Sequence, residues 1–124
     1  MKNRQRILIV EDEPLLALGM QDVLMMSGFE IAGIAGKLDK ALKLIEVGNY
    51  DAAIVDANLA SVSASPAASA LATRGLPFLV LSGYSADQLA GNFSGAAKIL
   101  QKPCASDRLI EALNTILRQP ELSA

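Results

Sequence analysis

The sequence contains no histidine and only one cysteine, and both shortages restrict its chemistry. Without histidine, a chain cannot build a Ser-His-Asp or Cys-His nucleophile, and most zinc sites are excluded as well. Cys104 has no second thiol to pair with, so it cannot form an internal disulfide. We expect it to fill space as a small apolar residue rather than to act as a redox thiol.

Basic charge and long hydrophobic runs are also scarce. Eleven Lys and Arg residues against thirteen Asp and Glu give a net charge of −2, which disfavours a nucleic-acid-binding surface. No apolar run approaches the roughly 20 residues of a membrane helix, and the N-terminus leads into a strand rather than a signal peptide. These absences predict a cytoplasmic protein that contacts neither membranes nor nucleic acid directly.

The sequence does have four short apolar runs that each end in polar residues. Three of them are apolar throughout, the run at 98–101 is apolar at its centre, and all are too short for helices, so they are typical of buried parallel strands. The runs are 7–10 before Glu11-Asp12-Glu13, 53–55 before Asp56, 78–81 before Ser82-Gly83, and 98–101 before Lys102-Pro103. Parallel strands end at the same edge of a sheet, so the acids, the hydroxyl and the ammonium are predicted to lie together.

Helical periodicity between these runs predicts alternating strands and helices through one α/β domain of residues 1–124, with a core at about 6–117 and a tail at 118–124. A further strand is expected at about 30–35. In the strand order 2-1-3-4-5, the first and third strands are neighbours, so Glu11, Asp12 and Asp56 converge. Clustered carboxylates cost energy unless a cation lies among them, and oxygen ligands favour Mg²⁺.

The helices are predicted from apolar spacing and end signals at 14–26, 38–47, 66–74 and from 107 to just before Pro120, with a short or irregular fourth helix near 86–90. Ser65 and Ser106 are the expected N-cap residues of the third and last helices. In the first helix, the predicted apolar stripe consists of Leu15, Leu18, Val23, Leu24 and Met26.

The polar positions resemble, in order and spacing, the motifs of response regulator receiver domains in two-component signalling. Asp12, Asp56, Ser82 and Lys102 are separated by 44, 26 and 20 residues by subtraction of their numbers. The resemblance covers about residues 6–117 and implies a flavodoxin-like (βα)5 fold with helices on both faces of the sheet. It also implies that Asp56 accepts a phosphoryl group from a histidine kinase or histidine phosphotransfer protein.

The resemblance implies a task for each neighbour of Asp56. Asp12 and Asp56 would bind Mg²⁺ directly, Glu11 through water, and Asn58 through its backbone carbonyl. Lys102 would offset charge on the phosphoryl oxygens.

Three further positions have implied roles. Ser82 would donate its hydroxyl to the phosphoryl group, and Gly83 would leave the phosphorus approachable. The Lys102-Pro103 bond is expected to be cis, as in relatives.

Several positions depart from the receiver pattern. Ile99 stands where relatives usually have Tyr or Phe, which puts the aromatic switch of that family in doubt, and Tyr84 is a candidate substitute. Cys104 replaces a common phenylalanine. The chain also resembles, in part, alphaproteobacterial single-domain receivers paired with HWE-type kinases, although their Phe-Ala-Thr-Gly stretch reads Val-Leu-Ser-Gly at 80–83.

Other interpretations remain open. Each motif taken alone also fits an ordinary turn or a solvated loop. A Mg²⁺-dependent phosphatase of the haloacid dehalogenase type also uses an aspartyl nucleophile, but it needs a second acid where this chain has Asn58. A third alternative is a receiver-like module that is never phosphorylated. No motif identifies a downstream target, and the chain either acts alone or is joined to an output domain outside this sequence.

Overall fold

The computed structural model describes residues 4–83, 93 and 95–118 of the chain. Five parallel strands form its central sheet: β1 (Arg6–Val10), β2 (Glu30–Ala35), β3 (Ala52–Asp56), β6 (Phe78–Ser82) and β7 (Lys98–Gln101). Their order is β2-β1-β3-β6-β7. Because β6 and β7 are the fourth and fifth strands of this sheet, the predicted order 2-1-3-4-5 and the predicted fold class are confirmed.

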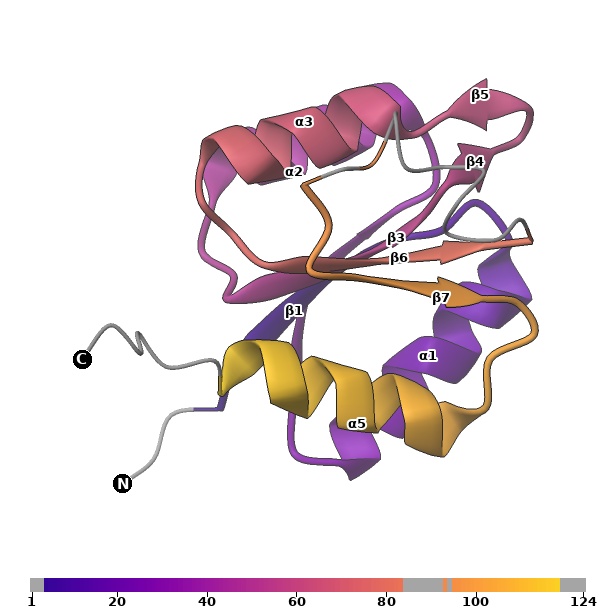
Figure 1. Ribbon diagram of the computed structural model, residues 1–124, viewed down its shortest axis with the longest axis vertical. Helices are drawn as coiled ribbons and strands as arrows, with labels where there is room; N and C mark the ends of the chain where they lie inside the picture. The colour runs from indigo at the N-terminus through magenta and orange to yellow at the C-terminus, as the bar shows by residue number, and fades with distance from the viewer. Residues whose placement is uncertain (1–3, 84–92, 94, 119–124) are drawn as a thin grey trace.

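Helices cover both faces of the sheet (Figure 1). One face carries α1 (Pro14–Met26) and α5 (Ser106–Leu117), and the other carries α2 (Leu38–Val47) and α3 (Ser65–Thr73). The four helices begin within one residue of their predicted starts, and α5 ends at Leu117, before the predicted stop at Pro120. No helix in the described part of the chain has the length and hydropathy that crossing a membrane requires.

The central strands are buried on both faces, which explains their continuous apolar sequences. In β3, Ala53 and Val55 pack toward α2 and α3, whereas Ala52 and Ile54 pack toward α1 and α5. The same alternation in β6 places the fully buried Phe78 in the hydrophobic cluster on the side of α2 and α3. Successive side chains along each strand therefore pack into two separate hydrophobic layers, one on each face of the sheet.

The first helix differs from its prediction. Leu15, Leu18 and Met26, three members of the predicted stripe, are 81 %, 52 % and 87 % exposed, so the assignment of these residues to a buried face is wrong. Ala17 and Leu24 are the buried residues of α1. Because nearly every position of this helix is apolar, hydrophobicity alone could not identify the side that faces the sheet.

The two serine N-cap predictions are also wrong, each by one position. Ala64 and Ala105 are the N-cap residues of α3 and α5, and the serines that follow are the first helical residues. Before α3, the hydroxyl of Ser63 accepts the backbone N–H of Ser65 at 3.1 Å. A neighbouring hydroxyl thus satisfies one of the N–H groups that a helix start leaves unpaired.

A short antiparallel hairpin between β3 and α3 was not predicted. It pairs β4 (Asn58–Leu59) with β5 (Val62–Ser63). Its turn residues, Ala60 and Ser61, have φ of 51° and 73°, values that favour glycine or asparagine. Since neither residue is typical of such a turn, the sequence contained no hairpin signal.

The connection between β6 and β7 packs against α3 where it is described. Phe93 is only 3 % exposed, and it belongs to the hydrophobic cluster that packs against α2 and α3. A Cβ atom added at Gly95 would lie 2.7 Å from the Cβ of Ala72, so the chain passes very close to α3. The short fourth helix expected near 86–90 lies outside the described residues.

Candidate active site at the carboxyl edge of the sheet

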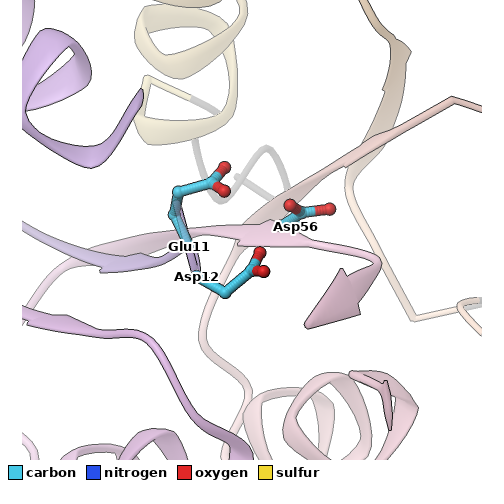
Figure 2. A group of neighbouring side chains, drawn as sticks. All are labelled: Glu11, Asp12 and Asp56. Carbon is cyan, nitrogen blue, oxygen red and sulfur yellow. The ribbon is translucent and has the colours of Figure 1, made fainter. Parts of the chain in front are cut away.

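The residues singled out in the sequence gather at one edge of the sheet. Asp56 and Ser82 are the last residues of β3 and β6, and Lys102 follows β7 directly. Glu11 and Asp12 follow β1, which is the neighbour of β3 in the sheet. Figure 2 shows the three acidic side chains beside one another. The parallel topology therefore produces the predicted convergence.

The three carboxylates form a tight group. One oxygen from each of Glu11, Asp12 and Asp56 can be chosen so that all three lie within 4.8 Å of one another. Glu11 and Asp56 are only 2 % and 5 % exposed, whereas Asp12 is half-buried. Water screens such buried charges poorly, so the group requires compensating positive charge.

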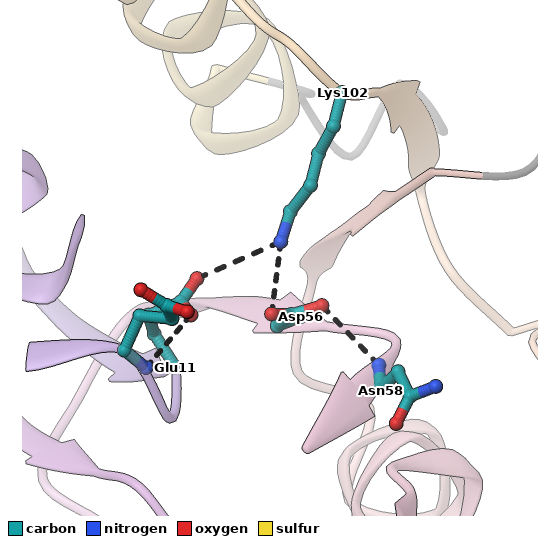
Figure 3. Close-up of polar contacts among 5 residues, drawn as sticks. Glu11, Asp56, Asn58 and Lys102 are labelled. Atoms are coloured by element: carbon teal, nitrogen blue, oxygen red, sulfur yellow. Dashed lines mark hydrogen bonds and ion pairs between the residues drawn. The ribbon is translucent and has the colours of Figure 1, made fainter. Parts of the chain in front are cut away.

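Lys102 supplies part of that charge (Figure 3). Its Nζ donates a hydrogen bond to Oδ2 of Asp56 at 2.9 Å and lies 4.0 Å from Oε1 of Glu11. Burial lowers the pKa of the Lys102 ammonium, but the hydrogen bond to Asp56 and the nearby acidic charges outweigh burial and raise the pKa overall. Lys102 is therefore a firmly protonated cation at the edge of the site.

Burial strongly perturbs the carboxyl group of Glu11. Burial raises its pKa to about 7, and the Asp56 charge adds to this effect, while the Glu13 N–H and the charge of Lys102 oppose it. The Glu13 N–H donates to Oε2 of Glu11 at 3.1 Å, which ties this carboxylate to the start of α1. Sequence reasoning missed that contact because it depends on the backbone turn into the helix.

A hard divalent cation fits these residues. Oε1 of Glu11 is buried and has no hydrogen-bond partner among the described residues. It therefore retains an acceptor that a metal-bound water could satisfy. Carboxylate oxygens are the ligands that Mg²⁺ prefers, and one lysine leaves three acids with excess negative charge. The donor set thus suits Mg²⁺ better than a metal that selects thiolate or imidazole.

Backbone contacts fix the remaining polar positions. The Asn58 N–H donates to Oδ1 of Asp56 at 3.2 Å, so this residue orients the carboxylate directly. Ser82 is 2 % exposed, and its carbonyl accepts the Lys102 N–H at 2.7 Å. Gly83 is exposed, and an added Cβ there would meet no described atom within 4 Å.

The other predicted positions have different environments. Ile99 pairs with Val80 across β6 and β7 and packs, partly buried, against the cluster that contains Phe93. The Lys102-Pro103 peptide bond is cis, as predicted. Tyr84, the candidate substitute for the aromatic switch, lies outside the described residues.

The sequence model of the response regulator receiver domain matches residues 7–114. The chain belongs to this family. Family membership supports the receiver hypothesis over the haloacid dehalogenase alternative, and it places the protein among two-component signalling proteins.

Two relatives illustrate the sequence similarity of this receiver domain. The transcriptional regulatory protein PdtaR of Mycobacterium tuberculosis is 32 % identical over 124 residues, which cover 97 % of this chain and 60 % of PdtaR. The DNA-binding response regulator MtrA of Mycolicibacterium smegmatis is 31 % identical over 121 residues, with 95 % and 53 % covered. The chain therefore spans only about 53–60 % of the length of these relatives.

Solved structures confirm the receiver fold. The response regulator TrrA of Thermotoga maritima, in complex with Mg²⁺ and BeF, matches with a TM-score of 0.81 and 27 % identity over 90 % of this chain and 98 % of TrrA. A CheY-like receiver domain of Methanospirillum hungatei matches with a TM-score of 0.84 and 24 % identity, covering 98 % of this chain and 100 % of that one.

Proposed function

We propose that Asp56 is the phosphoacceptor of this receiver domain and takes its phosphoryl group from a phosphohistidine on a partner kinase or phosphotransfer protein. The observation that carries this proposal is the buried group of Glu11, Asp12 and Asp56, with Lys102 bonded to Asp56 at 2.9 Å. Structural acids at a strand end do not need such an arrangement, whereas phosphoryl transfer to a carboxylate does.

The chemical step requires an oriented carboxylate and a cation. One oxygen of Asp56 attacks phosphorus, the P–N bond to the donor imidazole breaks, and its electron pair returns to the ring nitrogen. The Asn58 N–H holds Oδ1 of Asp56, which limits rotation of the nucleophile. As the phosphoryl group is transferred, the Lys102 ammonium exchanges its contact with Asp56 for one with a phosphoryl oxygen.

The proposed metal is Mg²⁺, held directly by Asp12 and Asp56, through water by Glu11, and by the backbone carbonyl of Asn58. When bound, it supplies positive charge that offsets the charge on the phosphoryl oxygens. The TrrA complex, which contains Mg²⁺ and BeF, supports this assignment through a relative of the same fold.

Ser82 is the proposed sensor of phosphorylation. Its hydroxyl is carried at the end of β6, the strand next to β3, so it needs only a local shift to donate to a phosphoryl oxygen on Asp56. The aromatic switch of the family is not available at Ile99, because an aliphatic side chain already packs there against the core. We propose that the shift of Ser82 passes instead to the adjoining β6–β7 connection.

The phosphohistidine must come from outside these 124 residues, because they contain no histidine. The exposed apolar face at the start of α1 lies beside the site and includes Leu15 and Leu18. Contiguous exposed apolar side chains are typical of protein contacts. We propose that the phosphodonor rests on this face while it presents its histidine to Asp56.

Small-molecule phosphate compounds test the proposed chemistry without the partner. With acetyl phosphate and Mg²⁺, we expect at most one phosphoryl group per chain, followed by slow self-hydrolysis. With a phosphate monoester, we expect no steady turnover. Sustained release of phosphate from the monoester would instead favour the phosphatase.

A further inference from the structure

The β4–β5 hairpin begins at Asn58, close behind Asp56, and its turn has an unfavourable conformation. Only Ala60 and Ser61 separate the two strands, with φ of 51° and 73°. A two-residue hairpin turn with positive φ at both positions favours Asn-Gly, because most residues that carry a Cβ atom avoid positive φ. Strained backbone of this kind persists only where surrounding contacts hold it in place, and it gathers at functional sites.

Contacts at the base of the hairpin supply that constraint. The Ala57 N–H donates to the carbonyl of Leu81 in β6, and the Ala57 carbonyl accepts the N–H of Ala64, both at 2.9 Å. Leu59 is only 2 % exposed and packs in the hydrophobic cluster on the side of α2 and α3. The chain is therefore fixed on both sides of the turn, and only two residues remain to reverse its direction.

Asn58 connects this hairpin to the acidic group. It pairs with Ser63 across the hairpin, and its N–H donates to Oδ1 of Asp56 at 3.2 Å (Figure 3). Because pairing with Ser63 restrains the backbone of Asn58, the turn that maintains this pairing also restrains the direction of the N–H. The hairpin forms a sheet of its own, so a looser turn would release this N–H from Asp56 and leave the five-stranded sheet in place.

We propose that Ala60 and Ser61 are positioning residues for Asp56, because their strained turn holds Asn58 in the orientation that aligns the carboxylate for attack on phosphorus. Neither side chain belongs to the acidic group, so the effect passes through the backbone of Asn58. The inference rests on the proposed phosphoacceptor function and adds a requirement for the hairpin. An aligned nucleophile reacts faster because its rotational freedom is already restricted before the transition state.

A graded set of turn variants in the whole chain tests this role. Ala60→Asn combined with Ser61→Gly gives the turn its preferred residues and should tighten the hairpin. Ser61→Val places a β-branched side chain at positive φ and should loosen the hairpin. Ala60→Pro, whose ring fixes φ at about −65°, should open it. Val62→Ala is the matched control, because this exposed hairpin residue lies outside the turn.

Two measurements report on the orientation of Asp56. Hydrogen exchange of the Asn58 backbone amide, in the metal-free protein without a phosphodonor, should be at least about tenfold faster in Ala60→Pro than in the wild type. Ser61→Val should exchange at an intermediate rate. Labelling by acetyl phosphate at saturating Mg²⁺ should slow about tenfold or more in Ala60→Pro, and it should not slow in the double variant or in Val62→Ala.

Urea unfolding of each variant separates positioning from stability. A turn with a purely structural role would change the unfolding midpoint and leave the labelling rate of the folded protein unchanged. Cooperative unfolding also shows that each variant folds. If Ala60→Pro does not fold, Ser61→Val and the double variant still decide.

Two results would overturn the role of the turn: Asn58 exchange that is the same in the loosened variants and the wild type, or labelling at the wild-type rate in spite of faster exchange. The phosphoacceptor proposal fails on a different observation, namely a wild type that acetyl phosphate never labels at Asp56. A labelled wild type with turn variants that behave identically would refute the positioning role alone.

Discussion

Replacing Glu11 with Gln should remove a large part of the pH dependence of stability in the metal-free protein. Glu11 is 2 % exposed, and burial is the main cause that raises its pKa from 4.5 to about 7. The folded protein therefore holds a proton on Glu11 more tightly than the unfolded chain does. Gln has nearly the same shape, stays neutral and keeps an oxygen that can accept the Glu13 N–H.

The sign and size of the effect follow from linkage. Because the folded pKa lies above the unfolded one, Glu11 contributes stability that is fully present below about pH 4.5 and is lost as pH rises through about 7. At about 1.4 kcal/mol per tenfold change in proton affinity, the loss amounts to about 3 kcal/mol. Typical domains have only about 5–15 kcal/mol in total, so the effect is easily measured.

Urea unfolding in EDTA, from about pH 5 to about pH 8, measures this quantity. The free energy of unfolding of the wild type should fall relative to Glu11→Gln by most of the 3 kcal/mol, which is roughly 1–3 M in the urea midpoint. Saturating Mg²⁺ should reverse the trend in the wild type, because the metal needs deprotonated ligands. Parallel profiles for the two metal-free proteins would refute the assignment of a buried, proton-binding Glu11.

Three further predictions concern the site and the core. Asp12→Ala should weaken Mg²⁺ binding about a hundredfold, as measured by calorimetry. The control Asp22→Ala, at an exposed acid of α1, should bind Mg²⁺ like the wild type. Equal losses of affinity in the two variants would contradict the role of Asp12 as a specific metal ligand. Lys102→Met should slow labelling by acetyl phosphate by about 10²–10³, and an unchanged rate would exclude its proposed role. Gly95→Ala should destabilise the fold by about 1–3 kcal/mol because its Cβ meets Ala72, and Ala72→Gly in the same chain should recover part of that loss in urea unfolding.

The sheet and its reactive edge were predictable because two independent signals agree. Apolar strands such as β3 and β6 are continuous in sequence, and the parallel topology requires their carboxyl ends to meet. The positions of Asp56 and Lys102 relative to each other followed from topology alone. Their 2.9 Å contact needed coordinates.

Other features depend on contacts that the sequence does not encode locally. In α1, apolar residues surround the helix, so only packing against the sheet reveals that Ala17 faces inward and Leu15 outward. The hairpin at Asn58–Ser63 uses Ala60 and Ser61 with positive φ, which turn chemistry does not predict.

The central claim is that Asp56 receives the phosphoryl group with the help of the surrounding acids and lysine. Mass spectrometry after treatment with acetyl phosphate and Mg²⁺ tests it most directly, with Asp56→Asn and an EDTA-treated wild type as controls. The wild type should gain the mass of one phosphoryl group, located on the peptide that contains Asp56, and both controls should remain unmodified. Equal labelling of the wild type and Asp56→Asn, or a phosphoryl group on another residue, would contradict the account.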